Sequence, residues 1–345
     1  MYQRFDLSHP TPHRFEFYGT GREYFRIWIV NLALSLITLG IYSAWAKVRR
    51  LRYFYGNTVL DGHSFDYHAS PMAILKGRLL IVAAVIVYNV IIAVVPAAAA
   101  FAGLALFIWP WVINRSIAFQ AQMTSYRSVR FNFAGSYWRA FVVYMVLPGL
   151  TLVSLGLLAP LAARARWEYL AENLRYGSSP FASDTRIGIF YSHLGATIVF
   201  AICMSAVTFV LQLKFGFLMA SVSKEDIITL AVVLAYIPLA LTFVFWRIGV
   251  RNIGISGFIL AKDIRFHAEQ GRLAFVWITA SNLVLTLLSL GLLRPWAAVR
   301  SWRALSESTV LATTISLNEF VGETRRYTNV MASEFADLQS VDLGF

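Results

Sequence analysis

Seven apolar segments of bilayer length constrain this chain more than any other feature. A helix needs about 17–25 mostly apolar residues to cross the hydrocarbon core of a membrane. Segments of that kind occupy residues 25–46, 79–95, 97–114, 139–162, 187–213, 226–246 and 273–293. Only 14% of the residues are charged, against about 25% in a soluble domain. We therefore predict an all-α polytopic membrane protein.

Two pairs of these segments are separated by very short connections. Pro96 alone lies between the second and third, and "KFGFLMASVSKED" joins the fifth to the sixth. Proline and loops this short favour tight turns between antiparallel helices. We expect two transmembrane helical hairpins at these positions.

A threefold internal repeat is predicted from three sequence offsets. At an offset of 116, "RFEFYGT" at Arg14 aligns with "RFNFAGS" at Arg130. A further offset of 135 aligns "SLGLLAP" (154–160) with "SLGLLRP" (289–295). Each unit has a short strand-like entry, an apolar segment ending near a glycine, a basic aromatic exit and a second strand-like piece. We expect short strand-like cytoplasmic pieces in every repeat, with the two hairpins between the repeats.

These boundaries predict seven parts of the chain. They are an N-terminal tail (1–13), repeat unit 1 (14–69), transmembrane hairpin 1 (72–126), repeat unit 2 (130–185), transmembrane hairpin 2 (187–262), repeat unit 3 (265–317) and an acidic C-terminal tail (318–345).

One long stretch resembles a known family. The residues "EYFRIWIVNLALSLITLGIYSAWAKVRRLRYFYGNTVLDGHSFDYH" (23–68) and the tail "FADLQSVDLGF" are similar to the YjgN-like family of bacterial inner-membrane proteins, a family of unknown function. The resemblance implies a multi-pass protein of the bacterial inner membrane. It carries over no catalytic or binding residues.

The distribution of lysine and arginine bears on the topology. If all seven segments cross, 13 of these cations lie on one side and 17 on the other, which gives no orientation by the positive-inside rule. If the repeated segments instead return to the side they entered from, 28 lie on one side and 2 on the other. The second arrangement obeys the rule better, with the basic ends cytoplasmic, but needs helix breaks. Candidate breaks are Gly40, Pro148, Gly156 and Gly291. Both topologies stay open at this point.

Same-sided repeats would also bring their strand-like pieces together. "RFEF", "RFNF", "NTVLDGHSFDYH" and "STVLATTISLN" combine β-branched or aromatic residues with turn-forming Asp61–Gly62. We expect these pieces to form a small cytoplasmic sheet under the membrane.

Two sets of polar residues are candidates for a site. The first is an intramembrane stripe at i, i+4, i+7 spacing, which either forms hydrogen bonds between helices or lines a shared polar pathway. Its members are Asn31, Ser35, Thr38, Thr151, Ser154, Asn282, Thr286 and Ser289. The second set lies in the basic exits and either anchors the topology or binds anionic lipid headgroups. It comprises Lys47, Arg49, Arg50, Arg52, Arg164, Arg166, Arg300 and Arg303.

Other chemistry has little support in the sequence. Asp61, His63, Asp66 and His68 are donors suited to a metal, but in an extended strand the first two face away from the last two. We predict no metal, no cofactor and no nucleic-acid partner, and we expect no enzyme, since no nucleophile–base constellation is visible. The single cysteine, Cys203, excludes an intramolecular disulfide.

Two functions remain as expectations. The first is transport or permeation through a polar centre built from the repeated segments. The alternative is a non-catalytic membrane scaffold or envelope-maintenance protein that binds anionic lipid or a protein partner whose identity the sequence does not indicate.

Overall fold

The fold is organised by a small closed β-barrel. The computed structural model describes residues 11–95, 103, 105–218, 224–261 and 263–327. Ten antiparallel strands close in the order β1-β10-β9-β8-β7-β6-β5-β4-β3-β2. Their bounds are β1 (Thr11–Phe17), β2 (Thr58–Leu60), β3 (His63–Tyr67), β4 (Thr124–Tyr126), β5 (Val129–Phe133), β6 (Leu174–Tyr176), β7 (Ser179–Ser183), β8 (Phe258–Leu260), β9 (Ile264–Ala268) and β10 (Thr309–Thr313).

Four tight hairpins build most of this barrel, and their turns meet at one end. In the β2–β3 hairpin the turn residues Asp61 and Gly62 have φ angles of 49° and 72°, which suit the short turns that join antiparallel strands. At the opposite end the register pairs Phe17 with Thr58 and Ala268 with Thr309. Every helical connection therefore leaves and rejoins the barrel at that second end.

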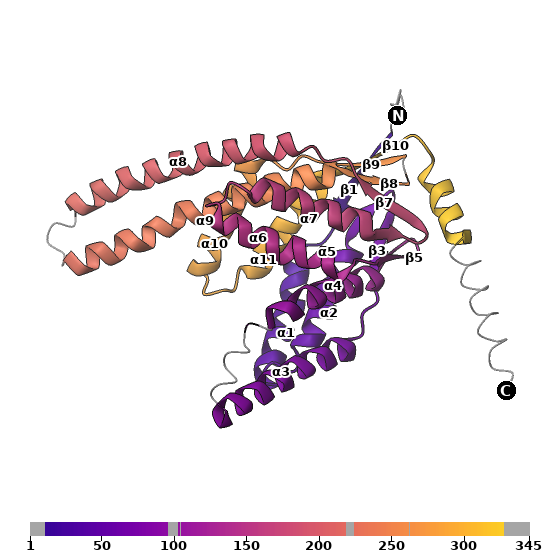
Figure 1. The fold of residues 1–345 in the computed structure, drawn as a ribbon, viewed down its shortest axis with the longest axis horizontal. Coiled ribbons are helices and arrows are strands. Elements are labelled where there is room, and N and C mark those ends of the chain that lie inside the picture. The colour runs from indigo at the N-terminus through magenta and orange to yellow at the C-terminus, as the bar shows by residue number, and fades with distance from the viewer. Residues whose placement is uncertain (1–10, 96–102, 104, 219–223, 262, 328–345) are drawn as a thin grey trace.

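Five helical arms make these connections, and we number them in chain order. Arm 1 (18–57) holds α1 (Gly21–Ile37) and α2 (Ser43–Gly56); arm 2 (68–123) holds α3 (Pro71–Val94) and α4 (Ala105–Met123); arm 3 (134–173) holds α5 (Tyr137–Phe141), the π-helix η2 (Val142–Val146), α6 (Leu147–Val153) and α7 (Ala159–Asn173); arm 4 (184–257) holds α8 (Ile187–Leu218) and α9 (Lys224–Ser256); arm 5 (269–308) holds α10 (Arg272–Leu288) and α11 (Arg294–Glu307). The arms fan out from the barrel, and α8 and α9 run side by side (Figure 1).

The prediction of an all-α polytopic fold with two transmembrane helical hairpins is wrong. The strand-like pieces are true strands, and they join others in a closed barrel. In the expected first hairpin, α3 packs mainly on α2, while α4 packs on β5 and α5. The expected turn at Pro96 lies outside the described residues. This fold depends on pairing between strands that are far apart in the sequence. The hydropathy of the helical segments, on which the prediction is based, carries no information about that pairing.

Two helices are long and apolar enough to cross a membrane, judged by length and composition alone. They are Pro71–Val94 and, within α8, Ile187–Lys214, each with a mean hydropathy of 2.3. This finding refers to the described part of the chain.

The barrel interior is packed, and a C-terminal helix (317–327) covers its hairpin end. Buried aromatic and aliphatic side chains from eight strands form the core, among them Leu60, Tyr126, Tyr176 and Ile264. Leu317, Phe320 and Val321 from the C-terminal helix are buried in the same cluster. The helix lies beside the barrel, away from the arms (Figure 1). The alternation of buried and half-buried residues in β10 follows from the period of two in a strand.

Arms 1, 3 and 5 turn back through an elbow of one geometry. The elbows are residues 38–42, 154–158 and 289–293. In each, a leucine and then a glycine have positive φ, with values of 90° at Gly40, 91° at Gly156 and 91° at Gly291. The glycine N–H donates to the carbonyl five residues earlier, at 2.7 Å in all three. This hydrogen bond belongs to the Schellman ending of a helix. Pro148 does not turn the chain, because α6 continues directly from η2.

Replacing an elbow glycine is expected to destabilise the protein. Gly40→Ala, Gly156→Ala and Gly291→Ala each place a Cβ at φ near 90°, which disfavours L-residues whatever the free space. We expect a loss of about 1 kcal/mol per substitution. Gly77→Ala is the matched control, since it lies inside α3 with open space around it and should be neutral or slightly stabilising. Thermal unfolding in detergent measures the difference, and equal effects at all four positions would refute this account of the elbows.

Candidate functional site

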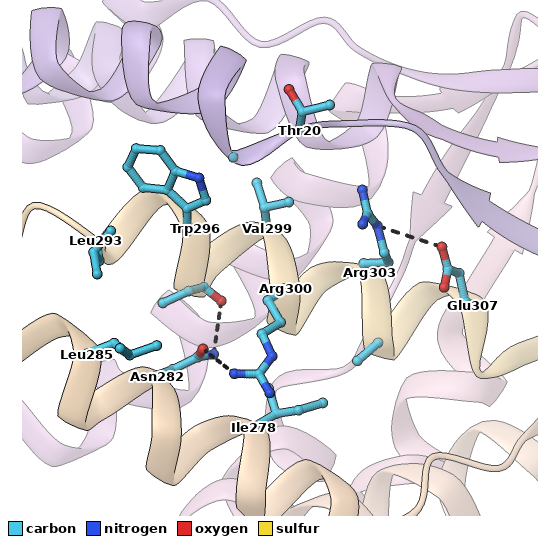
Figure 2. A pocket seen from close by; sticks show the side chains of 13 residues that line it. Thr20, Ile278, Asn282, Leu285, Leu293, Trp296, Val299, Arg300, Arg303 and Glu307 are labelled. Atoms are coloured by element: carbon cyan, nitrogen blue, oxygen red, sulfur yellow. Dashed lines mark hydrogen bonds and ion pairs between the residues drawn. The ribbon is translucent and has the colours of Figure 1, made fainter.

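A cavity of about 710 Å³ lies between α10, α11 and the start of α1, where arm 5 meets arm 1 (Figure 2). It runs along α11, from Leu293 near the elbow to Glu307 near the barrel. The fourteen residue steps from Leu293 to Glu307 correspond to about 21 Å of helix. The cavity is therefore long, and its two ends lie in different surroundings.

The end of the cavity near the elbow is apolar. Leu285 and Leu293 line it, together with Trp296, whose ring lies 5.1 Å from Phe25 of α1. Trp296 packs directly over Gly21, where any Cβ would overlap the indole ring. A glycine is required there because the backbone of α1 approaches the ring so closely.

The opposite end carries two guanidinium groups one helical turn apart. Arg300 Nη1 donates to Ser281 Oγ at 2.8 Å and to Asn282 Oδ1 at 3.3 Å. Asn282 in turn donates to the Ala297 carbonyl at 3.2 Å and to Ser301 Oγ at 3.0 Å. Arg300 is thus held in place by α10, and within the described residues these hydrogen bonds use only one of its three nitrogens.

Arg303 links the cavity to arm 1. Its Nη2 donates to the Gly19 carbonyl at 2.9 Å, and its Nε lies 3.8 Å from Glu307 Oε1. Thr20, also in the lining, caps α1 by accepting from the Glu23 N–H at 3.3 Å. The start of α1 adds a weak positive potential at this end. Two arginines against one glutamate leave the polar end of the cavity cationic.

The hydroxyl groups of the predicted polar stripe serve the elbows. Thr38, Ser154 and Ser289 accept from the N–H groups of Tyr42, Leu158 and Leu293 at 2.9, 3.1 and 3.0 Å. Each hydroxyl thus bonds across the elbow to the residue that directly precedes the next helix. Thr151 donates back to the Leu147 carbonyl, while the carbonyls of Ser35 and Thr286 accept the glycine N–H groups of their elbows.

The structure does not gather the stripe into one centre. Asn31 and Asn282 are both buried, and α1 packs on α11 beside α10. Thr151 and Ser154 lie in arm 3, where α6 packs on η2 and α7. Asn31 Oδ1 has no hydrogen-bond partner among the described residues, whereas Asn282 Oδ1 has Arg300.

The other predicted cations are distributed over α2 and α7. Arg52 donates to the Tyr67 and Ala69 carbonyls, and Arg164 pairs with Glu168 at 2.7 Å. Arg49 and Arg50 lie over the rings of Tyr42 and Phe54, while Lys47 and Arg166 are exposed. Of the eight, only Arg300 and Arg303 line the 710 Å³ cavity.

The Asp/His pattern in the β2–β3 hairpin is divided among other partners. Asp61 lies 3.2 Å from His13 Nδ1 and 3.9 Å from Arg127, while His68 Nε2 lies 2.7 Å from Ser125 Oγ. No group of three metal-type ligands occurs among the described residues.

Sequence reasoning missed two kinds of residue around the cavity. Gly21 and Trp296 are recognisable only from their contact, which joins residues far apart in the chain. Arg251 of α9, outside the cavity lining, is half-buried and donates to the Leu305 carbonyl at 2.6 Å and to Thr309 Oγ1 at 2.8 Å. Burial lowers the pKa of this guanidinium to about 10, so it stays charged at neutral pH and ties α9 to the end of arm 5.

Comparison with known sequences identifies the family. The family described as "Bacterial protein of unknown function (DUF898)" matches residues 12–338. The chain belongs to this family. It is 27% identical over 354 residues to "Inner membrane protein YjgN" of Salmonella typhimurium, with 85% of this chain and 87% of that protein covered. The YjgN proteins of Escherichia coli O157:H7 and K12 are 35% and 34% identical over 149 residues, or 42% of this chain and 37% of each relative.

These relatives confirm the resemblance inferred from residues 23–68 and support an inner-membrane protein of the DUF898 family. No solved structure matches this fold.

Proposed function

We propose that this DUF898 protein is a non-catalytic, multi-pass scaffold of the bacterial inner membrane. In this proposal α3 and α8, the two described helices that are long and apolar enough to cross a membrane, span the bilayer. Arms 1, 3 and 5 enter only the adjacent leaflet through their elbows, and the barrel lies at the cytoplasmic surface. The same-sided topology is thereby preferred to seven crossings.

The observation that carries the proposal is the exposure of the three elbow tips. Leu39, Leu155 and Leu290 are 94%, 95% and 95% exposed, although each is the turn of a folded arm. Each tip lies among further exposed apolar side chains, such as Leu152 and Val153 beside Leu155, and soluble proteins rarely expose a contiguous apolar patch. The 17-residue helices α1 and α10 are about 25 Å long, short of the roughly 30 Å hydrocarbon core. Elbows on such helices fit a leaflet better than a full crossing.

Charge supports the orientation. Among the residues that the structure describes, all lysines and arginines except Lys214 and Lys224 lie in the barrel, in the short arms, in the C-terminal helix or in the parts of arms 2 and 4 nearer the barrel. Cationic residues favour the cytoplasmic side, so this distribution favours a cytoplasmic barrel. It also favours anionic lipid headgroups as partners of the basic residues where the arms meet the barrel.

The shared elbow geometry supports a threefold internal repeat, with units 14–69, 130–185 and 265–317. In arms 1, 3 and 5 the helix before the elbow ends on the same Schellman hydrogen bond, and a hydroxyl at the start of the elbow accepts from the N–H four residues later. A permeation pathway has less support, because the described barrel interior is filled by its own core and hydroxyls of the polar stripe are used in the hydrogen bonds of the elbows.

The depth of an elbow tests this function. We expect a spin label at Leu290→Cys, in a Cys203→Ser background, to meet molecular oxygen often and a water-soluble nickel chelate rarely in liposomes. A label at Ser178→Cys, in the exposed β6–β7 turn, should show the reverse. Equal accessibility of both labels to the nickel chelate would contradict leaflet insertion.

A further inference from the structure

The cavity between α1, α10 and α11 has the build of a site for one amphiphile. We propose that it binds a single anionic phospholipid, with the headgroup at the end of the cavity lined by Arg300 and Arg303 and the upper acyl chains along Leu285 and Leu293. This inference rests on the proposed function, because it requires the elbow of arm 5 (289–293) to lie in the leaflet.

The cavity has a cationic end and an apolar end, as a phospholipid has a charged headgroup and apolar acyl chains. From Leu293 to Arg303 is ten residues of helix, or about 15 Å, and half of the hydrocarbon core is about the same. If Leu290 reaches the middle of the bilayer, Arg303 lies at the depth of the phosphates. Arg300 is one turn deeper, where a long side chain still reaches the headgroups. Figure 2 shows the Arg300 guanidinium pointing toward Asn282 of α10 and the Arg303 guanidinium pointing toward Thr20, so the two groups lie on either side of α11.

The two arginines retain hydrogen-bonding capacity for a phosphate. Among the described residues, Arg300 donates hydrogen bonds only through Nη1. Arg303 donates through Nη2 to the Gly19 carbonyl at 2.9 Å, and its Nε lies 3.8 Å from Glu307 Oε1. A guanidinium group matches the geometry of phosphate oxygens. Glu307, in the same lining, opposes an anion, but it leaves one net positive charge. Asn282, itself buried, fixes Arg300 before any ligand arrives.

The corresponding place in arm 1 is built differently, which singles out this cavity. Arg49 lies at the position of Arg300 by the offset of 251, but it stacks on Tyr42, and Asn31 Oδ1 has no partner among the described residues. The preformed arginine–asparagine pair therefore belongs to arm 5.

Native mass spectrometry of the delipidated full chain tests the proposal. We expect one phosphatidylglycerol to bind to the wild type and to bind about thirtyfold more weakly to the Arg300→Gln/Arg303→Gln variant, from about 1 kcal/mol per lost cation. The matched control, Arg325→Gln/Arg326→Gln, removes two exposed charges from the C-terminal helix and should bind like the wild type. Ala304→Phe fills the cavity without changing charge and should also weaken binding, so it carries the test if the double variant does not fold.

Three outcomes would overturn the proposal. They are equal binding by the double variant and its control, equal binding of phosphatidylcholine and phosphatidylglycerol, and displacement by glycerol 3-phosphate alone, which would show a site for a soluble phosphate. The spin-label measurement at Leu290 is independent of all three. A buried elbow with unchanged lipid binding would reject this site and keep the proposed function, while an exposed elbow would reject the function itself.

Discussion

Ending the chain after Ile315 is expected to prevent the protein from accumulating in a folded form. This truncation removes Leu317, Phe320 and Val321, which are buried in the barrel core, and it uncovers the hairpin end of the barrel. Burial of three such side chains contributes roughly 6 kcal/mol, comparable to the whole stability of many domains. Membrane-fraction abundance and size-exclusion chromatography in detergent measure the loss.

The matched control ends the chain after Tyr327. It removes only residues beyond those that the structure describes, so the covering helix stays. We expect this shorter protein to accumulate and elute like the full chain. If both truncations behaved alike, the packing of residues 317–327 on the barrel would not stabilise the fold.

Tyr169→Ala is expected to destabilise the protein by about 3–5 kcal/mol. Tyr169 of α7 has no exposed surface, and it packs against Phe133 at the end of β5. Its hydroxyl donates to Asn114 Oδ1 at 2.5 Å and lies 3.2 Å from the Ser136 carbonyl. The residue therefore joins α4, α7 and the start of arm 3 to the barrel, and its removal leaves both a cavity and unpaired polar groups.

Two further substitutions separate these contributions. Tyr169→Phe keeps the ring and loses only the hydroxyl, so we expect a loss of about 1–2 kcal/mol. Trp138→Ala removes a larger aromatic side chain that is 73% exposed, and it should change the unfolding midpoint in detergent little. A similar unfolding midpoint for Tyr169→Ala and Trp138→Ala would contradict the packing described where arm 3 meets the barrel.

The sequence predicted the elbows better than the barrel, for a physical reason. Gly40, Gly156 and Gly291 follow leucines at the ends of apolar segments. A backbone conformation that requires glycine shows in the sequence as a glycine at that same position. The barrel depends on pairing between residues far apart, such as Thr11 of β1 with Thr313 of β10. Strands of three residues, such as β6 and β8, are too short to show a period of two.

The cavity was predictable only in part. Arg300 and Arg303 stand out as cations at the end of an apolar segment, and Asn282 as a polar residue inside one. The contact between Asn282 of α10 and Arg300 of α11 follows from the elbow of arm 5 (289–293). The approach of Gly21 to Trp296 follows from barrel closure between arms 1 and 5. No property of the local sequence indicates that second contact.

The side of the membrane reached by two hairpins of the barrel tests the central claim most directly. His63 and Ser178 are both exposed, in the β2–β3 and β6–β7 hairpins, and single cysteines can replace them in a Cys203→Ser background. One barrel at the cytoplasmic face predicts that a membrane-impermeant maleimide labels both in inverted vesicles and neither in intact spheroplasts. Seven alternating crossings would place three spans between them, so labelling from opposite sides would contradict the account.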